Sequence, residues 1–420
     1  MIESTNFRTG IGGSFLRTTP AARSQMPQRL YDPSRNTSIP APMHSQSLPR
    51  IVEKNRHEWL VQTRLFDLES IVDVEPQVNP RQWLLSGNPR LASLITQTIG
   101  DRWITHLEDL QQLVPMADHP LFQLRWRAVK QANKQVLANE IYQSQGIRIN
   151  VNSLIDLQLQ PIVGHQRQLL NILHIITLFN QIKQNPGLNI LPRTFIFGDI
   201  ATEHGAGLRS DCHEGHEYHH EQQETDSNSA TLALIKSLAK IFAADPDVSG
   251  KLQVVYVPES AGLTNQMYAA ADLTQQIATA AMEDIDLSQL RATINGVVSI
   301  GSLGKTNYWL QQIVGEQNCF RFGLAIPEIA LFKEYGYDPY NYYKYYPQIR
   351  QAIDYLLAGY FTPDDPSVCR SIIDTLLGTD EQMVLADYIF YAACQHHVSD
   401  IYRQASSWTQ MSIMNVAGVK

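Results

Sequence analysis

The chain has 420 residues, of which 44% are hydrophobic and 18% are charged, and its formal net charge at pH 7 is -8. This size allows one large or two medium-sized domains, and the acidic balance argues against nucleic acid as a partner. There is no apolar run of the roughly 20 residues that a membrane span needs, no signal-peptide pattern and no CxxC pair among the four cysteines. We therefore expect a cytoplasmic protein with reduced cysteines, either free or at the cytoplasmic face of a membrane as part of a larger complex.

Residues 1–57 form a basic segment with eight Lys or Arg against three acidic residues, which leaves -13 for the rest of the chain. Prolines, glycines and polar residues dominate this segment, so it cannot bury enough apolar surface to fold alone. We predict an extended arm that is disordered unless a partner binds it, and a plain disordered tail is the alternative. The side chains expected to enter an acidic, partly apolar groove of a partner are Phe7, Arg8, Phe15, Arg17, Arg23, Arg29, Tyr31 and Arg35.

Residues 58–75 are predicted to connect this arm to a domain that spans 76–420, in which β-rich runs alternate with helical patterns. The strand-like runs are 193–200, 252–259, 296–303 and 319–324, and the clearest helical patterns are 168–184 and 230–244. Such alternation predicts an α/β fold with a parallel sheet covered by helices on both faces. From about residue 338 the pattern becomes mainly helical.

Five stretches of this domain, in order, resemble the C-terminal domain of the glycogen (starch) phosphorylase family. They are PRQWLLSGNPRLASLI (80–95), NVNSLIDLQLQ with RQLLNILHIITLFNQIK (150–183), AADLTQQIATA (270–280), INGVVSIGSL (294–303) and VLADYIFYAACQHHVSDIYRQASSWTQM (384–411). The resemblance covers roughly residues 76–418 and implies the Rossmann-like C-terminal half of a GT-B glycosyltransferase fold. The family's active site lies between two domains, and we expect only one of its two walls here, because the arm stands in place of the N-terminal domain.

The resemblance also implies which residues to inspect for the family's pyridoxal phosphate, which is held by a lysine in a stretch reading EASGTGNMKF. Counted back from Asn295 and Gly296, Arg291 stands at the lysine position. A guanidinium stays protonated and cannot form the aldimine. The glycine-rich turn is replaced by DIDLSQL (284–290), and only Glu283 keeps the family's sugar-contacting residue. We therefore expect no cofactor.

Two further motifs of the family have lost basic residues. KRIHEYKRQ corresponds to QPIVGHQRQ (160–168), where Pro161 and Gln166 replace basic residues and Arg167 remains. GGKAAPGY corresponds to GDIATEHG from Gly198, with Ile200 at the lysine position. Such changes remove the electrostatic stabilisation of a transferred phosphate. The resemblance therefore predicts a pseudoenzyme without glucan phosphorolysis.

Residues 203–229 are rich in histidine and are interpreted as a loop insertion. A spacing of three would place His213, His216 and His219 on one face of a helix, where they could bind zinc, nickel or copper. The glycines of the segment favour a surface loop without a functional metal, so these histidines are weak metal candidates.

Residues 336–361 contain eight tyrosines. Some match a GYxxxxYY pattern of the family and are expected in the core, whereas the excess is typical of protein interfaces. The interface candidates are Tyr342, Tyr343, Tyr345 and Tyr346, and core packing is the alternative for each.

These observations lead to one functional hypothesis and two alternatives. The hypothesis is a non-catalytic phosphorylase-like protein that serves as a structural or linker component of an acidic multisubunit complex, docked through its arm; the phycobilisome is one such complex, and a homodimer is also compatible. The first alternative is a glucan- or sugar-phosphate-binding module without turnover, supported by Glu283 and Arg167. The second is an enzyme with altered, metal-dependent chemistry that uses the histidine-rich insertion.

Overall fold

The computed structural model describes residues 80–162, 167–198, 218–258, 261–280 and 287–419. The basic arm (1–57), the connecting segment (58–75) and residues 203–217 of the histidine-rich insertion lie outside this part of the chain. The predictions made for them therefore stay predictions.

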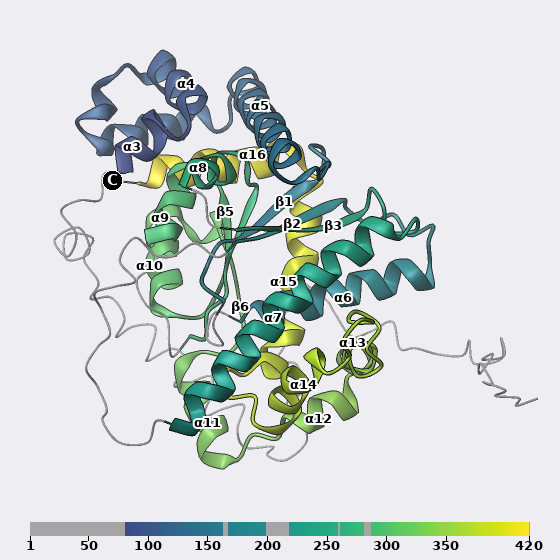
Figure 1. Cartoon of the computed structure of the whole chain (residues 1–420). Coiled ribbons are helices and arrows are strands. Elements are labelled where there is room, and N and C mark those ends of the chain that lie inside the picture. Colours follow the sequence, from purple (N-terminus) through teal and green to yellow (C-terminus); the bar gives the residue numbers. More distant parts are fainter. Residues whose placement is uncertain (1–79, 163–166, 199–217, 259–260, 281–286, 420) are drawn as a thin grey trace, which may run out of the picture. The chain divides into compact units, whose positions relative to one another are not determined.

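Six parallel strands of the described residues form one sheet, in the order β3-β2-β1-β4-β5-β6 (Figure 1). They are β1 (Leu154–Gln158), β2 (Arg193–Gly198), β3 (Leu252–Val257), β4 (Leu273–Gln276), β5 (Val298–Ser302) and β6 (Phe320–Phe322). In the register, Asp156 of β1 lies beside Phe195 of β2 and Leu273 of β4. The strand order reverses between β1 and β4, as in doubly wound sheets. The predicted α/β class with a Rossmann-like parallel sheet is confirmed.

Helices cover both faces of this sheet (Figure 1). Those before β1 are α3 (Pro80–Leu85), α4 (Pro89–Ile99), the 3-10 helices η2 (Arg102–Ile104) and η3 (Leu107–Met116), and α5 (Pro120–Gln145). Those between the strands are α6 (Gln168–Gln184), α7 (Tyr218–Ala244), α8 (Ala261–Ala270), α9 (Leu287–Ile294), α10 (Lys305–Val314) and the 3-10 helix η5 (Glu316–Asn318). Those after β6 are α11 (Ile326–Tyr335), α12 (Pro339–Tyr345), α13 (Pro347–Leu357), α14 (Val368–Gly378), α15 (Val384–Tyr402) and α16 (Ala405–Gly418).

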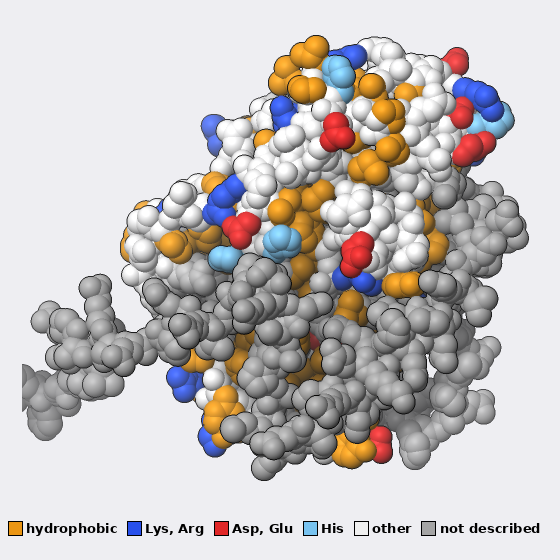
Figure 2. All heavy atoms as spheres, turned by 180° about the vertical axis from the view of Figure 1, so that it is seen from behind, with side chains coloured by type: hydrophobic (Ala, Val, Ile, Leu, Met, Phe, Trp, Pro, Cys, Tyr) orange, Lys and Arg blue, Asp and Glu red, His pale blue; other side chains and the backbone are white. Residues whose placement is uncertain are grey.

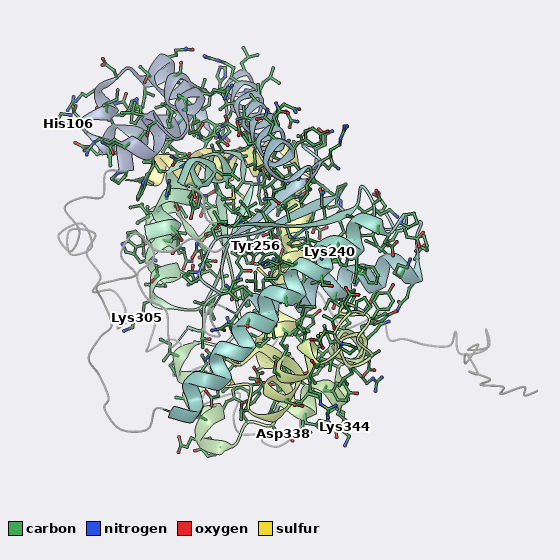
Figure 3. All side chains as sticks on the ribbon, in the orientation of Figure 1. His106, Lys240, Tyr256, Lys305, Asp338 and Lys344 are labelled. Atoms are coloured by element: carbon green, nitrogen blue, oxygen red, sulfur yellow. The ribbon has the colours of Figure 1, made fainter. Side chains whose placement is uncertain are left out.

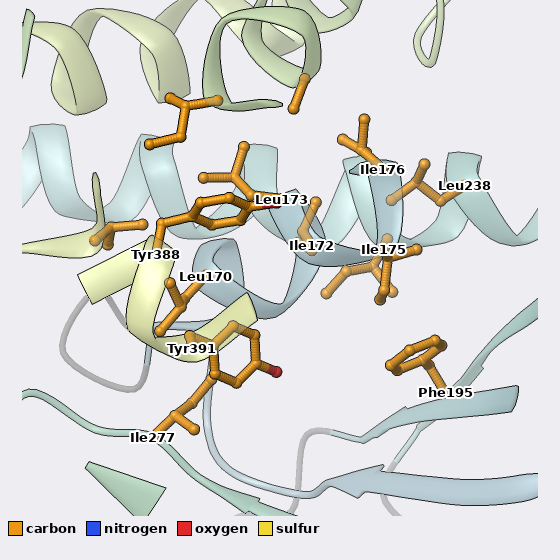
Figure 4. Close-up of a cluster of buried hydrophobic side chains, with 14 of the residues drawn as sticks. Leu170, Ile172, Leu173, Ile175, Ile176, Phe195, Leu238, Ile277, Tyr388 and Tyr391 are labelled. Atoms are coloured by element: carbon orange, nitrogen blue, oxygen red, sulfur yellow. The ribbon is translucent and has the colours of Figure 1, made fainter. Parts of the chain in front are cut away.

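The two faces of the sheet pack against different helices. Phe195 and Phe197 of β2 join a core cluster with residues of α6, α7 and α15, whereas Ile196 between them joins a cluster with residues of α5 and α8. Alternation along a strand explains this division, because successive side chains point to opposite faces. Figure 4 shows the first cluster, in which Leu173 of α6 and Tyr388 of α15 lie close together above the sheet.

Helix α5 is fixed at the amino ends of the central strands by two lysines. Lys134 Nζ lies 2.5 Å from the Asp272 carboxylate, and both side chains are buried. Lys130 Nζ donates to the backbone carbonyls of Ala269 and Ala271 at 3.2 and 2.7 Å. Burial lowers the pKa of Lys130 to about 8. These contacts cover the amino ends of the central strands, which leaves their carboxyl ends as the candidate place for a ligand.

Helix α7 corrects one predicted boundary. It begins at Tyr218, so residues 218–229, which the sequence analysis assigns to a loop, are helical. The glycines that favour a loop all precede residue 216, and residues 218–229 contain neither glycine nor proline. Helix formation therefore meets no backbone obstacle in this stretch. No helix in the described part of the chain is long and apolar enough to cross a bilayer.

Candidate functional site

In doubly wound sheets, ligands bind at the carboxyl ends of the strands where the strand order reverses. In this sheet the order reverses between the central strands β1 and β4, and we call the carboxyl ends of the strands there the carboxyl edge. Three of the residues singled out from the sequence, Gln166, Ile200 and Glu283, lie outside the described residues. Pro161 is partly buried just after β1, and its carbonyl accepts a hydrogen bond from Gln168 Nε2 at 2.9 Å. The two arginines, Arg167 and Arg291, are described in full.

Arg291 lies in α9, and its guanidinium lies over two aromatic rings. The carbon of the guanidinium is 5.2 Å from the ring centroid of Tyr268 in α8 and 5.9 Å from that of Trp83 in α3. Its Nη2 donates to the side-chain oxygen of Asn265. Stacking on aromatic faces is a geometry that arginine adopts readily because its planar charge is weakly hydrated. Arg291 therefore joins α3, α8 and α9 rather than pointing into open space.

Arg167 has a different environment from the one that the sequence analysis gives it. It precedes α6 with φ of 52°, is buried, and lies 2.5 Å from the Asp387 carboxylate of α15. Its Nε also donates to the carbonyl of Ile277 at 2.6 Å. Burial raises the pKa of Asp387, and the charge of Arg167 opposes that rise. Arg167, the basic residue that remains in its motif, is thus part of a core ion pair and not a free contact for a phosphate.

Uncharged polar side chains gather at the carboxyl ends of β1, β4 and β5 and on α9. Gln160, Gln276, Gln289 and Ser302 are all buried. Each has a polar atom without a hydrogen-bond partner among the described residues, namely Gln160 Oε1, Gln276 Nε2, Gln289 Oε1 and Ser302 Oγ. An unpaired buried polar atom costs about 1–3 kcal/mol, so such groups are ordinarily satisfied by water or a ligand.

Asn307 of α10 connects part of this cluster. Its Nδ2 donates to the carbonyl of Gln276 at 2.9 Å, and its Oδ1 accepts from Gln289 Nε2 at 2.8 Å. A Cβ at Gly301 would lie 2.2 Å from Asn307 Oδ1, so only glycine allows this approach. The edge is thus a fixed array of amide donors and acceptors, which suits a neutral ligand with hydroxyl groups better than a phosphate.

Comparison with known proteins identifies the family. A family model described as carbohydrate phosphorylase matches residues 60–207 and 225–420. A glycogen phosphorylase of Synechocystis sp. is 35% identical over 379 residues, which cover 90% of this chain and 41% of that protein. The muscle form of glycogen phosphorylase from Oryctolagus cuniculus is 31% identical over 378 residues, or 90% of this chain and 42% of that protein.

The chain belongs to the carbohydrate phosphorylase family. It spans about two fifths of the length of the curated relatives that it matches, at 41% and 42%. The membership agrees with the resemblance seen in the sequence and with the parallel sheet. The residues at the family's motif positions are therefore compared with what the reaction of those relatives needs.

The residues described here do not fit the pyridoxal phosphate that the family implies. Arg291, which the sequence resemblance assigns to the position of the aldimine lysine, has no amine that can form an aldimine, and its guanidinium lies over the rings of Trp83 and Tyr268. The two other described positions of the basic motifs offer no free charge either, because Pro161 is uncharged and Arg167 is paired with Asp387. No step of a reaction can therefore be derived through this cofactor.

A polar network that the motifs do not reveal lies inside the phosphorylase-like domain, between the sheet and α15. Arg193 Nη1 lies 3.3 Å from Asp156 Oδ2 and donates to Gln395 Oε1 at 2.6 Å. Gln275 Nε2 donates to Asp156 Oδ1 at 2.7 Å, and the Tyr391 hydroxyl donates to Gln275 Oε1 at 2.9 Å. Burial raises the pKa of Asp156 to about 6. Because these groups satisfy one another, we interpret the network as structural.

The metal and surface predictions have different outcomes. His213 and His216 lie outside the described residues, and the side chain of His219 does too; among the remaining residues no cluster of His, Cys, Asp or Glu is arranged to hold a metal.

Tyr342 is buried, so its core alternative is correct, whereas Tyr345 is exposed and Tyr343 and Tyr346 are partly exposed. Figure 2 shows charged side chains of both signs scattered over the described part of one face, without a basic band.

Proposed function

We propose that this member of the phosphorylase family does not carry out pyridoxal-phosphate-dependent phosphorolysis and serves instead as a structural linker in a multisubunit assembly. The observation that carries the proposal is the packing of Arg291 between Trp83 and Tyr268, with a bond to Asn265. Covalent cofactor attachment needs an amine that can lose its proton, whereas the guanidinium of Arg291 stays protonated. The neighbouring Arg167 is engaged in a core ion pair and leaves no compensating charge.

The loss of chemistry is tested with the purified full-length chain and the Synechocystis relative in parallel. Both are incubated with pyridoxal phosphate and passed through gel filtration, and then cofactor stoichiometry and glucose 1-phosphate release from glycogen are measured. We expect stoichiometric cofactor and activity for the relative, and neither for this chain. Phosphate-dependent release of glucose 1-phosphate by this chain, above a protein-free control, would refute the proposal.

The linker part of the proposal depends on the basic arm, whose surplus of positive charge contrasts with the acidic remainder of the chain. Arginine and aromatic side chains close together suit an acidic protein groove, and a phycobilisome is one complex that offers such grooves. The test is sedimentation of native lysate with full-length protein and with a variant in which Arg17, Arg23, Arg29 and Arg35 are changed to glutamate. We expect the first in a heavy fraction and the second in a light one, and two light proteins would exclude the linker role.

A second candidate function, ligand binding without turnover, is favoured by the unpaired atoms of Gln160, Gln276, Gln289 and Ser302. We expect the site to take a neutral glucan rather than a sugar phosphate, because its unpaired groups are uncharged and Arg167, the basic motif residue nearest to it, is paired with Asp387. Thermal unfolding with maltotriose or glucose 1-phosphate distinguishes the two. A saturable rise in Tm with maltotriose alone is expected, and no rise with either would remove this candidate.

A further inference from the structure

The helices α12 and α13 carry exposed side chains in addition to those that they pack into the core. The ring centroids of Tyr340 and Tyr343 are 5.5 Å apart, and the Tyr343 hydroxyl donates to Asp354 Oδ1 at 2.8 Å. Leu357 follows Asp354 by one helical turn and is 51% exposed, as is Tyr340. We call Tyr340, Tyr343, Asp354 and Leu357 the tyrosine face. Figure 3 shows Asp338 and Lys344, which flank it on α12, at the margin of the described residues.

The tyrosine face has the properties of a binding surface rather than of scattered exposed residues. Its two rings lie close together, and the bond to Asp354 holds Tyr343 in one orientation. Tyrosine loses little side-chain entropy on binding because it has only two rotatable angles. Flat aromatic rings beside a carboxylate are the features that accept proline rings together with an arginine.

The segment of the chain that contains this face carries a small acidic excess. Residues 333–374, all of which the structure describes, carry six acidic and four basic side chains, and every one of them is exposed. The acidic ones are Glu334, Asp338, Asp354, Asp364, Asp365 and Asp374. A partner segment with an excess of arginine is therefore attracted to the region.

The chain itself contains a segment of this chemistry. Between residues 27 and 50 the basic arm holds five prolines and three arginines and has Asp32 as its one acidic residue. We propose that the tyrosine face of one copy binds the proline- and arginine-bearing arm of a second copy. This rests on the docking role proposed above for the arm and names another copy of this chain as its binding partner.

Such a contact joins unlike surfaces, an arm on one side and a helical face on the other. Each copy therefore offers one of each, and association continues from copy to copy until a ring closes or a filament forms. A symmetric dimer through identical patches is a different arrangement and would not show complementation between two defective variants.

The experiment uses three proteins: the unmodified chain, a face variant with Tyr340→Ser, Asp354→Lys and Leu357→Ser, and an arm variant with Arg29, Arg35 and Arg50 changed to glutamate. Sedimentation velocity over a range of concentrations measures self-association. We expect association of the unmodified chain that weakens with salt, and a dissociation constant at least about tenfold higher for either variant. An equimolar mixture of the two variants should form dimers and nothing larger, because one intact arm meets one intact face.

Two controls separate docking from folding. Tyr142→Ser removes an exposed tyrosine of α5, away from the tyrosine face, and should leave association unchanged. The face variant should keep the cooperative thermal unfolding of the unmodified chain, because its three side chains are exposed or partly exposed.

Three results would overturn the inference: an unmodified chain that stays monomeric, a face variant that associates like the unmodified chain, or a mixture without complementation. The lysate experiment distinguishes these from failure of the linker role. If the arm variant leaves the heavy fraction of the lysate while the pure unmodified chain is monomeric, only the binding between copies of this chain is contradicted. An arm variant that stays in the heavy fraction contradicts the docking role of the arm.

Discussion

The two polar regions of the sheet differ in how completely their groups are paired. Between the sheet and α15, Asp156, Arg193 and Gln275 form hydrogen bonds to one another and to Tyr391 and Gln395. At the carboxyl edge, buried side chains such as Gln276 and Gln289 keep an atom without a partner in the described part of the chain. Paired groups stabilise the fold and leave nothing for a ligand, whereas unpaired ones cost stability unless something else satisfies them. The contrast assigns a structural role to the first region, and it is the reason why we propose a binding site in the second.

The largest expected effect is loss of a partner in the paired region. Arg193→Met leaves Asp156 buried without its cation and should lower the free energy of unfolding by about 3–5 kcal/mol. Arg403→Met is the matched control, because Arg403 pairs with Asp400 at 3.3 Å on the surface, where an ion pair contributes about 0–1 kcal/mol. Urea unfolding measures both. Equal, small losses for the two variants would contradict the structural interpretation of the network.

The second prediction concerns pH in the same region. The pKa of Asp156 rises from 3.8 to about 6 on folding, so the folded state binds the proton more tightly than the unfolded state. Its contribution to stability is therefore present at low pH and is lost as pH rises from about 4 to about 6. Asp156→Asn removes that contribution. The difference in urea midpoint between the two proteins should change across this interval and be flat above it, and a difference independent of pH would exclude the raised pKa.

The third prediction tests the site where the family holds its cofactor. Arg291→Ala removes the stacking on Trp83 and Tyr268 and should cost about 2 kcal/mol of unfolding free energy. Arg291→Lys keeps a cation over the rings and should cost less. Urea unfolding of the two variants gives the comparison. An alanine variant as stable as the unmodified chain would show that this packing is not what holds α9 against α3 and α8.

The smallest effect on stability is expected at the carboxyl ends of the strands. The same substitution, glutamine to methionine, is made in both regions so that its effects can be compared. Gln276→Met removes an amide whose Nε2 is unpaired and should change stability by no more than about 1 kcal/mol in either direction, while it abolishes the rise in Tm with maltotriose. Gln395→Met removes a paired amide and should cost about 1–3 kcal/mol without affecting that rise. Equal losses of stability for the two variants would remove the distinction between the regions.

Particular elements show why some parts of the fold follow from the sequence and others do not. The helical pattern of 168–184 predicts α6 to the residue, because its apolar spacing is regular. The runs LIDLQ and LTQQ do not predict strands, yet they form β1 and β4 at the centre of the sheet and are buried along their whole length. Asp156 and Gln275 interrupt the apolar pattern there, and their burial is stable because they hydrogen-bond to each other across the two strands.

The candidate site divides in the same way. The sequence alone predicts, through its resemblance to the family, that Arg291 stands at the lysine position, and it determines that the arm is basic, because residue identity and spacing are sufficient for both statements. Only the tertiary structure decided that Trp83 and Tyr268 enclose that guanidinium and that Arg167 pairs with Asp387, 220 positions later in the chain. The physical reason is that pairing of a polar group depends on which distant segments the packed sheet and helices bring within hydrogen-bond reach, and no local pattern encodes that distance.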